Sequence, residues 1–239
     1  MRAALPAAAG VAAAWTVPAL APLSPPLAAA LRIALRSAHP GTVALTFDDG
    51  PHPQGTPAVL EILHAAGARA TFFLVGEQVR RAPALAGEIA AAGHSIALHC
   101  DRHRTLLRLS PRGLADDLDR AAGSIHAATG VVPVLHRAPY GIYSWPALRA
   151  VRARSWVPVL WSRWGRDWRR DATPATIAAI AAGGIAGADV VLLHDADDYG
   201  APGSWRATAA ALPAILAAVD AAGLRPVPLS GPADLAQGR

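Results

Sequence analysis

The sequence contains no lysine, no asparagine and a single cysteine, Cys100. All 22 basic residues are therefore arginines, and the formal net charge is +5. These arginines are scattered and form no basic helix or binding motif, so we expect no nucleic-acid partner. One cysteine excludes a disulfide within the chain. No H-E-x-x-H segment occurs, which argues against the metalloproteases that carry this motif.

The first forty residues differ in composition from the rest of the chain. Between Arg2 and Arg32 there is no charged residue, and alanine and proline dominate. The interval is long enough to span a bilayer. One interpretation is a signal peptide or membrane anchor, which would place the protein in the cell envelope or outside the cell. The alternative is a flexible arm on a cytoplasmic enzyme. We expect residues 1–40 to lie outside a catalytic domain at 41–239, and deletion up to about Arg36 to leave active protein.

From residue 42 onward, short apolar runs alternate with helical patterns. The chain has 239 residues, 53% of them hydrophobic, which suffices for one sizeable core. We expect strands at 43–47, 70–75, 94–99, 134–137, 157–161, 189–194 and 224–227, and helices at 57–66, 83–92, 110–129, 145–153, 173–182 and 204–222. This alternation predicts a parallel sheet with outer helices. By itself it does not distinguish an open sheet from a barrel.

Polar residues gather where the predicted strands end. Six of them lie at or just past a carboxyl end: Asp48, Asp49, His99, Arg137, Asp167 and His194. Active sites of parallel α/β barrels lie at that end of the strands. The sequence therefore predicts an active site at the carboxyl ends of the strands.

Two histidines and an acidic pair have the composition of a metal site. If a turn of helix follows the third strand, His99 and His103 face the same way. With a carboxylate from Asp48 or Asp49 they form a three-ligand site with an open position for water. Taken alone, H-x-x-x-H more often marks surface histidines, and D-D-G-P also fits a solvated turn. His194, after four apolar residues, by itself fits a core histidine better than a catalytic one.

Five motifs in order carry a family resemblance. They are T-F-D-D-G-P at 46–51, H-C-D-R-H at 99–103, R-A-P-Y-G at 137–141, D-W at 167–168 and L-L-H at 192–194. Together they resemble the signatures of the polysaccharide deacetylases, the chitin-deacetylase-like enzymes of carbohydrate esterase family 4 with a NodB homology domain. The resemblance covers about residues 42–228, and five ordered motifs are far more specific than any one.

The resemblance implies a fold and an activity. The implied fold is α/β, a distorted (β/α)7 barrel with parallel strands and outer helices. The implied activity is metal-dependent removal of N-acetyl, or O-acetyl, groups from a carbohydrate such as a GlcNAc-containing glycan. The implied cofactor is a divalent metal, most often Zn²⁺, with Co²⁺ or another divalent ion as alternatives, bound by Asp49, His99 and His103.

The resemblance also implies roles for the other motif residues. Asp48 is expected to be the general base, oriented by Arg137. His194 is expected to be the general acid, held by Asp167. Three residues are expected to contact the substrate. The Tyr140 backbone N–H is expected to stabilise the oxyanion, and Trp168 and Leu192 are expected to surround the acetyl methyl.

Cys100 departs from the family pattern, which usually has Ser or Thr after the first histidine. A thiol hydrogen-bonds more weakly than a hydroxyl. It could approach the metal, but the neighbouring residues already supply the usual number of ligands. We therefore expect Cys100 to be structural.

The expected partner is an acetylated glycan, and peptidoglycan or a related envelope polymer is one candidate. We expect a monomer, with any membrane contact made only through the N-terminal segment. Two alternatives stay open: a C–N hydrolase of a non-sugar amide on the same scaffold, and a non-catalytic glycan-binding relative. The presence of both Asp48 and His194 argues against the second.

Overall fold

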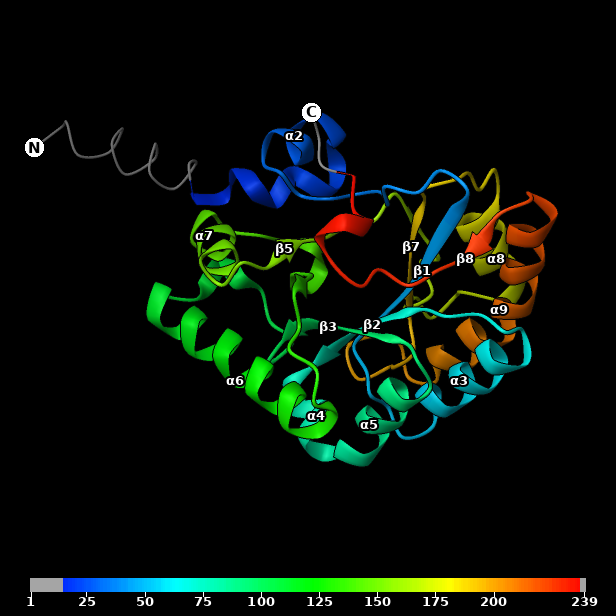
Figure 1. Ribbon diagram of the computed structural model, residues 1–239, viewed down its shortest axis with the longest axis horizontal. Helices are drawn as coiled ribbons and strands as arrows, with labels where there is room; N and C mark the ends of the chain where they lie inside the picture. The colour runs from blue at the N-terminus through cyan, green and yellow to red at the C-terminus, as the bar shows by residue number, and fades with distance from the viewer. Residues whose placement is uncertain (1–14, 237–239) are drawn as a thin grey trace, which may run out of the picture.

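Eight strands pair in parallel as one sheet within residues 15–236, the part of the chain that this computed structural model describes (Figure 1). The strands are β1 (Thr42–Asp48), β2 (Thr71–Val75), β3 (Ser95–Cys100), β4 (Leu135–His136), β5 (Val157–Pro158), β6 (Arg163–Trp164), β7 (Val190–His194) and β8 (Arg225–Pro226). Their order is β5-β4-β3-β2-β1-β7-β6, and β8 pairs with β1. The sheet curls into a half-barrel surrounded by helices, which confirms the expected distorted barrel.

Helices surround the outside of the sheet (Figure 1). They are α2 (Pro25–Ala30), α3 (Gly55–Ala65), α4 (Gly76–Arg81), α5 (Pro83–Ala91), α6 (Pro111–Thr129), α7 (Trp145–Ala153), α8 (Pro174–Ala182) and α9 (Ser204–Ala221), with short 3-10 helices η1 (Val17–Leu23), η2 (Leu106–Arg108), η3 (Pro139–Gly141) and η4 (Pro232–Asp234). Local signals set several of their ends. The Ser110 hydroxyl accepts the Gly113 N–H at the start of α6, and Gly130 ends that helix in the left-handed region with φ 71°.

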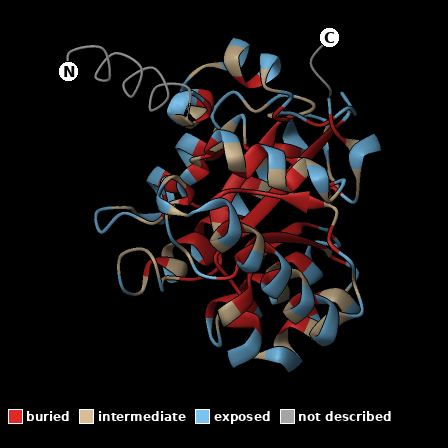
Figure 2. Cartoon of the chain, turned by 90° about the vertical axis from the view of Figure 1, so that its left-hand side faces the viewer, coloured by how far each residue is buried: buried red, intermediate tan, exposed pale blue. Residues whose placement is uncertain are grey.

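The core lies between the sheet and the helices. Every residue of β1 and β2 is buried, and Figure 2 shows buried strands at the centre with exposed outer helix faces. A strand buried on both faces needs a continuous apolar run, which is why residues 43–47 and 71–75 are recognisable in the sequence. The core thus holds β1 rigidly beneath the acidic pair at its end.

The short elements differ from the expectation. The strands expected at 134–137 and 157–161 contain only two residues each in β4 and β5, while β6 and α4 were not expected. A strand of two residues or a helix of six is too short to show a hydrophobic period. These elements depend on their neighbours in the sheet rather than on local pattern.

Within the N-terminal segment, residues 21–36 pack on the barrel. Ala21 and Ala28 are fully buried, Ile33 is 3% exposed, and all three belong to the main core cluster. Small alanines let the two short helices approach the core closely. Residues 1–14 lie outside the described residues, and the signal or anchor interpretation of residues 1–40 stays a prediction. No helix within residues 15–236 is long and apolar enough to cross a bilayer.

The same segment bridges the open side of the half-barrel. The Ala34 N–H donates to the Pro158 carbonyl at 2.9 Å, and the Leu160 N–H donates to the Ala34 carbonyl at 2.8 Å, beside β5. Two residues on, Arg36 pairs with Asp189 at 2.7 Å, next to the start of β7. Residues 34–36 therefore link the β5 edge of the sheet to β7.

Candidate active site

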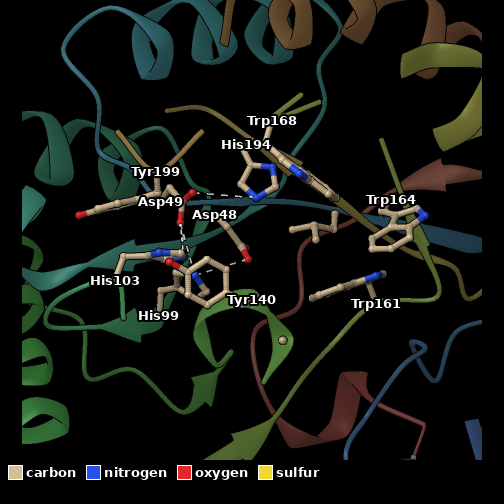
Figure 3. A pocket seen from close by; sticks show the side chains of 12 residues that line it. Asp48, Asp49, His99, His103, Tyr140, Trp161, Trp164, Trp168, His194 and Tyr199 are labelled. Carbon is tan, nitrogen blue, oxygen red and sulfur yellow. Dashed lines mark ion pairs between the residues drawn. The ribbon is translucent and has the colours of Figure 1, made fainter. Parts of the chain in front are cut away.

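The sequence-expected residues converge at the carboxyl ends of the strands, in a cavity of about 230 Å³ (Figure 3). Sheet register contributes directly, because Asp48 of β1 is paired with His194 of β7. The cavity is lined by Asp48, Asp49, His99, His103, Tyr140, Gly141, Trp161, Trp164, Trp168, Leu192, His194 and Tyr199. Arg137 and Asp167 lie behind this lining, each fully buried.

Both carboxylates of the acidic pair reach the cavity, although strand geometry opposes it. Successive side chains of a strand point to opposite faces. Strand β1 ends at Asp48, and Asp49 follows with φ 81°, a backbone region that non-glycine residues rarely adopt. This left-handed turn brings the second carboxylate to the same side as the first. Backbone strain of this kind persists where the surrounding structure enforces it, often at functional sites.

Asp49, His99 and His103 form a cluster that fits a metal ion. Asp49 Oδ1 lies 3.4 Å from Nε2 of each histidine, and no hydrogen bond satisfies this buried oxygen. His99 Nδ1 lies 2.8 Å from the Arg137 carbonyl. Since a carbonyl only accepts, the ring proton is on Nδ1, and Nε2 presents its lone pair to the carboxylate. A cation between these groups would stabilise that arrangement, and one carboxylate with two imidazoles suits zinc.

A bend, and not a helical turn, brings His103 to the cluster. Residues 101–105 contain no helix, and the rings of His99 and His103 lie 5.2 Å apart. His103 stacks on Tyr199 at 4.4 Å and meets the edge of Tyr140 at 4.5 Å. Aromatic packing from two other loops therefore orients this histidine. The spacing in the sequence indicated that His99 and His103 belong together, but not that aromatic packing orients His103.

Arg137 orients Asp48 and His99 together. Its Nη1 donates to Asp48 Oδ1 at 2.6 Å and to the Thr46 hydroxyl at 2.9 Å, while its backbone carbonyl accepts from His99. Its guanidinium carbon lies 3.9 Å from the Phe73 ring centroid. A buried ion pair of this kind needs several hydrogen bonds to offset the loss of water. The result is a carboxylate held in one orientation at the edge of the metal-ligand cluster.

His194 is held by Asp167 in the arrangement of an acid–base pair. Its Nδ1 lies 2.9 Å from Asp167 Oδ1, and its backbone N–H donates to Asp167 Oδ2 at 2.7 Å. The Thr208 hydroxyl also donates to Oδ2, at 2.8 Å. The ring therefore presents Nε2 to the cavity, 4.0 Å from Asp49 Oδ2. This is the orientation in which an imidazole can exchange a proton with a bound substrate.

Burial and neighbouring charge separate the pKa values of these groups. Burial alone would raise the pKa of Asp49, but contacts with His99, His194 and His103 lower it to about 2. Burial lowers the pKa of His103 to about 4. Burial would also lower the pKa of His194, but the negative charges of Asp167, Asp49 and Asp48 outweigh it and raise that pKa to about 10. At neutral pH, Asp49 and neutral His103 suit metal binding, and protonated His194 suits a proton donor.

Trp168 and Leu192 line the apolar end of the cavity, as expected. Trp168 meets His194 edge to face at 5.5 Å. Tyr140 adopts φ 60° and ψ 7° in η3, and its side chain is 57% exposed at the cavity mouth. Three further aromatic residues line the cavity and were missed: Trp161, Trp164 and Tyr199. Trp161 and Trp164 lie a few residues before the D-W motif, and this proximity in the sequence could have indicated that they line the cavity.

Two other groups near the site bear on metal binding. Cys100 is buried, and burial raises the pKa of its thiol. Within residues 15–236 it is not part of the ligand group of Asp49, His99 and His103, and its structural role stays a prediction. A second group of His52, Asp197 and Asp198 fits a metal less well. His52 Nδ1 accepts the Gly55 N–H at 2.9 Å, so its proton is on Nε2, facing Asp197 at 3.2 Å.

Asp195 is a buried acid that sequence reasoning missed. It follows His194 directly, accepts a hydrogen bond from the Thr56 hydroxyl, and leaves Oδ1 without a partner. Burial raises its pKa to about 7. A Cβ at Gly50 would lie 2.5 Å from Asp195 Oδ2, so glycine after the acidic pair lets β7 approach the turn. Asp195 therefore supports the loop that carries Asp49.

Comparison with known proteins agrees with this geometry. The sequence profile of the family described as "Polysaccharide deacetylase" matches residues 36–154. A chitooligosaccharide deacetylase of Bradyrhizobium sp. (strain ANU 289) is 37% identical over 155 residues, which cover 64% of this chain and 70% of that protein.

Solved structures show the same fold. The Bc1960 peptidoglycan N-acetylglucosamine deacetylase superposes with a TM-score of 0.77 and 28% identity, covering 83% of this chain and 91% of that one. A family 4 carbohydrate esterase from Streptomyces lividans, solved in complex with acetate, gives a TM-score of 0.73 and 28% identity over 83% and 98% of the two chains. From its motifs, its cavity and these relatives, the chain belongs to the polysaccharide deacetylase family.

Proposed function

We propose that this protein is a metal-dependent deacetylase that hydrolyses the acetamide of GlcNAc residues in a glycan. The observation that carries the proposal is the convergence of three side-chain sets in one cavity. They are the ligand cluster around Asp49, the Arg137–Asp48 pair and the Asp167–His194 pair. Similar proteins named as chitooligosaccharide and peptidoglycan deacetylases support the substrate class.

Asp49, His99 and His103 would hold a divalent ion, for which zinc suits the donor set best and cobalt is an alternative. When bound, such an ion supplies Lewis acidity and lowers the pKa of a coordinated water. Asp48 Oδ2 remains free of Arg137, whose guanidinium occupies Oδ1. Asp48 can therefore accept a proton from the attacking water as general base.

His194 acts at the other side of the amide. Its pKa, raised to about 10, keeps the imidazole protonated at neutral pH. As the C–N bond breaks, Nε2 donates its proton to the departing amine nitrogen, while Asp167 stabilises the imidazolium. In this proposal Trp168 and Leu192 receive the acetyl methyl, and the Tyr140 backbone N–H stabilises the developing oxyanion.

An envelope glycan as substrate implies a location in the cell envelope or outside the cell. Peptidoglycan-N-acetylglucosamine deacetylases of Bacillus cereus and Listeria monocytogenes are among the similar proteins. The location of this protein is proposed on that basis.

The test is acetate release from three glycans: chitooligosaccharides, acetylxylan and peptidoglycan. We expect release from at least one GlcNAc-containing glycan, its loss after chelation and its return with added Zn²⁺ or Co²⁺. Release from acetylxylan alone would assign the protein to O-deacetylation instead. Release that survives complete chelation would contradict the metal-dependent mechanism.

A further inference from the structure

The apolar end of the cavity extends past the two residues assigned to the acetyl methyl. Trp164 of β6 is paired with Leu192 of β7, and paired residues of parallel strands project to the same face. The Trp164 ring lies 5.6 Å from Trp168, and Trp161 stacks beside Trp164 at 6.0 Å. Figure 3 shows Trp161 and Trp164 on the side of Asp48 opposite to His103 and Tyr199.

Contacts from outside hold these two indoles in place. A Cβ at Gly141 would lie 2.6 Å from Trp161 Cη2 and 3.2 Å from Pro22, so Trp161 packs closely against η3 and near the N-terminal segment. The guanidinium of Arg137 lies 5.8 Å from the Trp161 ring, and that of Arg166 lies 4.8 Å from the Trp164 ring. The far wall of the cavity is thus supported from behind rather than free to collapse inward.

The space and its chemistry exceed what a methyl group requires. The whole cavity, from the Asp49 cluster to the indoles, measures about 230 Å³. A methyl group is similar in size to a water molecule, whose share of liquid volume is about 30 Å³, so it fills only a small part of this space. Its charged lining, Asp48, Asp49 and the histidines, would surround the reacting amide under the proposed function. Tyr140 and Tyr199 pack against His103. The rest of the lining is apolar and consists of Gly141, Trp161, Trp164, Trp168 and Leu192, and such a surface favours additional methylene groups.

We propose that this protein hydrolyses N-acyl groups longer than acetyl, with propionyl and butyryl chains lying against Trp161 and Trp164. The inference rests on the proposed function, since it concerns the acyl side of the same amide. Water supplies hydroxide to the acyl carbon and the C–N bond breaks. The products are a short-chain carboxylate and the free amine, which takes up the proton, so no further reactant is required.

The first test compares chitooligosaccharides carrying N-acetyl, N-propionyl or N-butyryl groups. A pocket closed around a methyl group would reject one extra methylene by about 10–200-fold in kcat/KM. We expect propionyl and butyryl substrates to stay within about tenfold of acetyl. Propionyl hydrolysis more than about tenfold slower than acetyl hydrolysis would match a closed pocket and overturn the inference while leaving the deacetylase proposal intact.

Substitution of Trp164 tests the wall itself. Trp164→Ala removes contacts to the distal carbons, so we expect the butyryl-to-acetyl ratio of kcat/KM to fall about tenfold. Trp145→Ala is the matched control, because Trp145 is 44% exposed on α7 and does not line this cavity. A ratio that rises in Trp164→Ala would show that Trp164 closes the pocket to longer chains, which contradicts the proposal.

Ligand binding separates the two proposals without turnover. Titration of the zinc-loaded protein with acetate, propionate and butyrate, followed by tryptophan fluorescence, should show affinity rising about threefold to fourfold per methylene. If affinity rises in this way but no acyl glycan is hydrolysed, the apolar end of the cavity does bind longer acyl chains, and the proposed function is wrong. If acetyl groups are hydrolysed but affinity falls with chain length, the function stands and the longer-chain inference is wrong.

Discussion

The two ends of the cavity are stabilised by different kinds of interaction. At the polar end, Asp48, Asp49 and His99 are buried, and each depends on a specific partner within a few ångströms. At the apolar end, Trp161, Trp164 and Leu192 make non-directional contacts. An unpaired buried charge costs several kcal/mol, whereas an apolar contact changes in small increments with area. The polar end should therefore respond to substitution in large steps, and the apolar end gradually.

The largest expected effects divide metal binding from proton transfer within the acidic pair. Asp49→Ala or His103→Ala removes a ligand, so metal and activity should be lost together. Asp48→Asn should keep the metal and lower turnover by about 10²–10⁴-fold, because it removes only the general base. Bound metal by elemental analysis and acetate release are measured on the same preparations. Metal lost from Asp48→Asn but kept by Asp49→Ala would reverse the two roles.

The next effect concerns the pH profile of His194. Burial alone would lower its pKa, but Asp167, with smaller contributions from Asp49 and Asp48, raises it to about 10. A raised pKa keeps the ring protonated as pH rises, and the proton donor is lost only when pH passes that value. Asp167→Asn should therefore move the alkaline limb of kcat to lower pH by about 1–3 units. The control is Asp171→Asn, because Asp171 is an exposed carboxylate paired with Arg169. An equal shift in both variants would show that the alkaline limb of kcat does not report the titration of His194.

A third prediction tests whether the N-terminal segment belongs to the fold that supports the apolar end. Ile33 is 3% exposed in the core, whereas Leu23 of the same segment is 79% exposed. Ile33→Ala should lower the free energy of unfolding by about 2–5 kcal/mol, and Leu23→Ala should change it by less than about 0.5 kcal/mol. Urea unfolding of the two variants makes the comparison. Equal, small effects would restore the original expectation of a separate arm.

The smallest effect is expected at Cys100, beside the polar end but outside its ligand set. Cys100→Ser introduces the residue type usual in the family, so activity should stay within about tenfold and the metal content should not change. Elemental analysis and acetate release are again the measurements. Complete loss of metal from this variant would make the thiolate a ligand.

The fold could be predicted from the sequence where the pattern was long enough. Strands such as β1 and β7 and helices such as α6 have apolar runs or caps that show their ends. The two-residue strands and α4 have none, and the packing of residues 21–36 was masked by an alanine-rich composition that resembles a signal or arm. Local pattern identifies an element only when several turns or residues of it repeat.

At the candidate site, the sequence by itself determined which polar residues belong together. The motifs are short and ordered, and they contain Asp48, Asp49, His99, Arg137, Asp167 and His194. Only the tertiary structure decided that Asp49 turns back through a left-handed backbone, that Tyr140 and Tyr199 orient His103, and that Trp161 and Trp164 extend the cavity. The reason is that polar chemistry requires particular residue types at fixed positions. Any apolar side chain of suitable size can line a wall, so its place is decided by packing between elements distant in the chain.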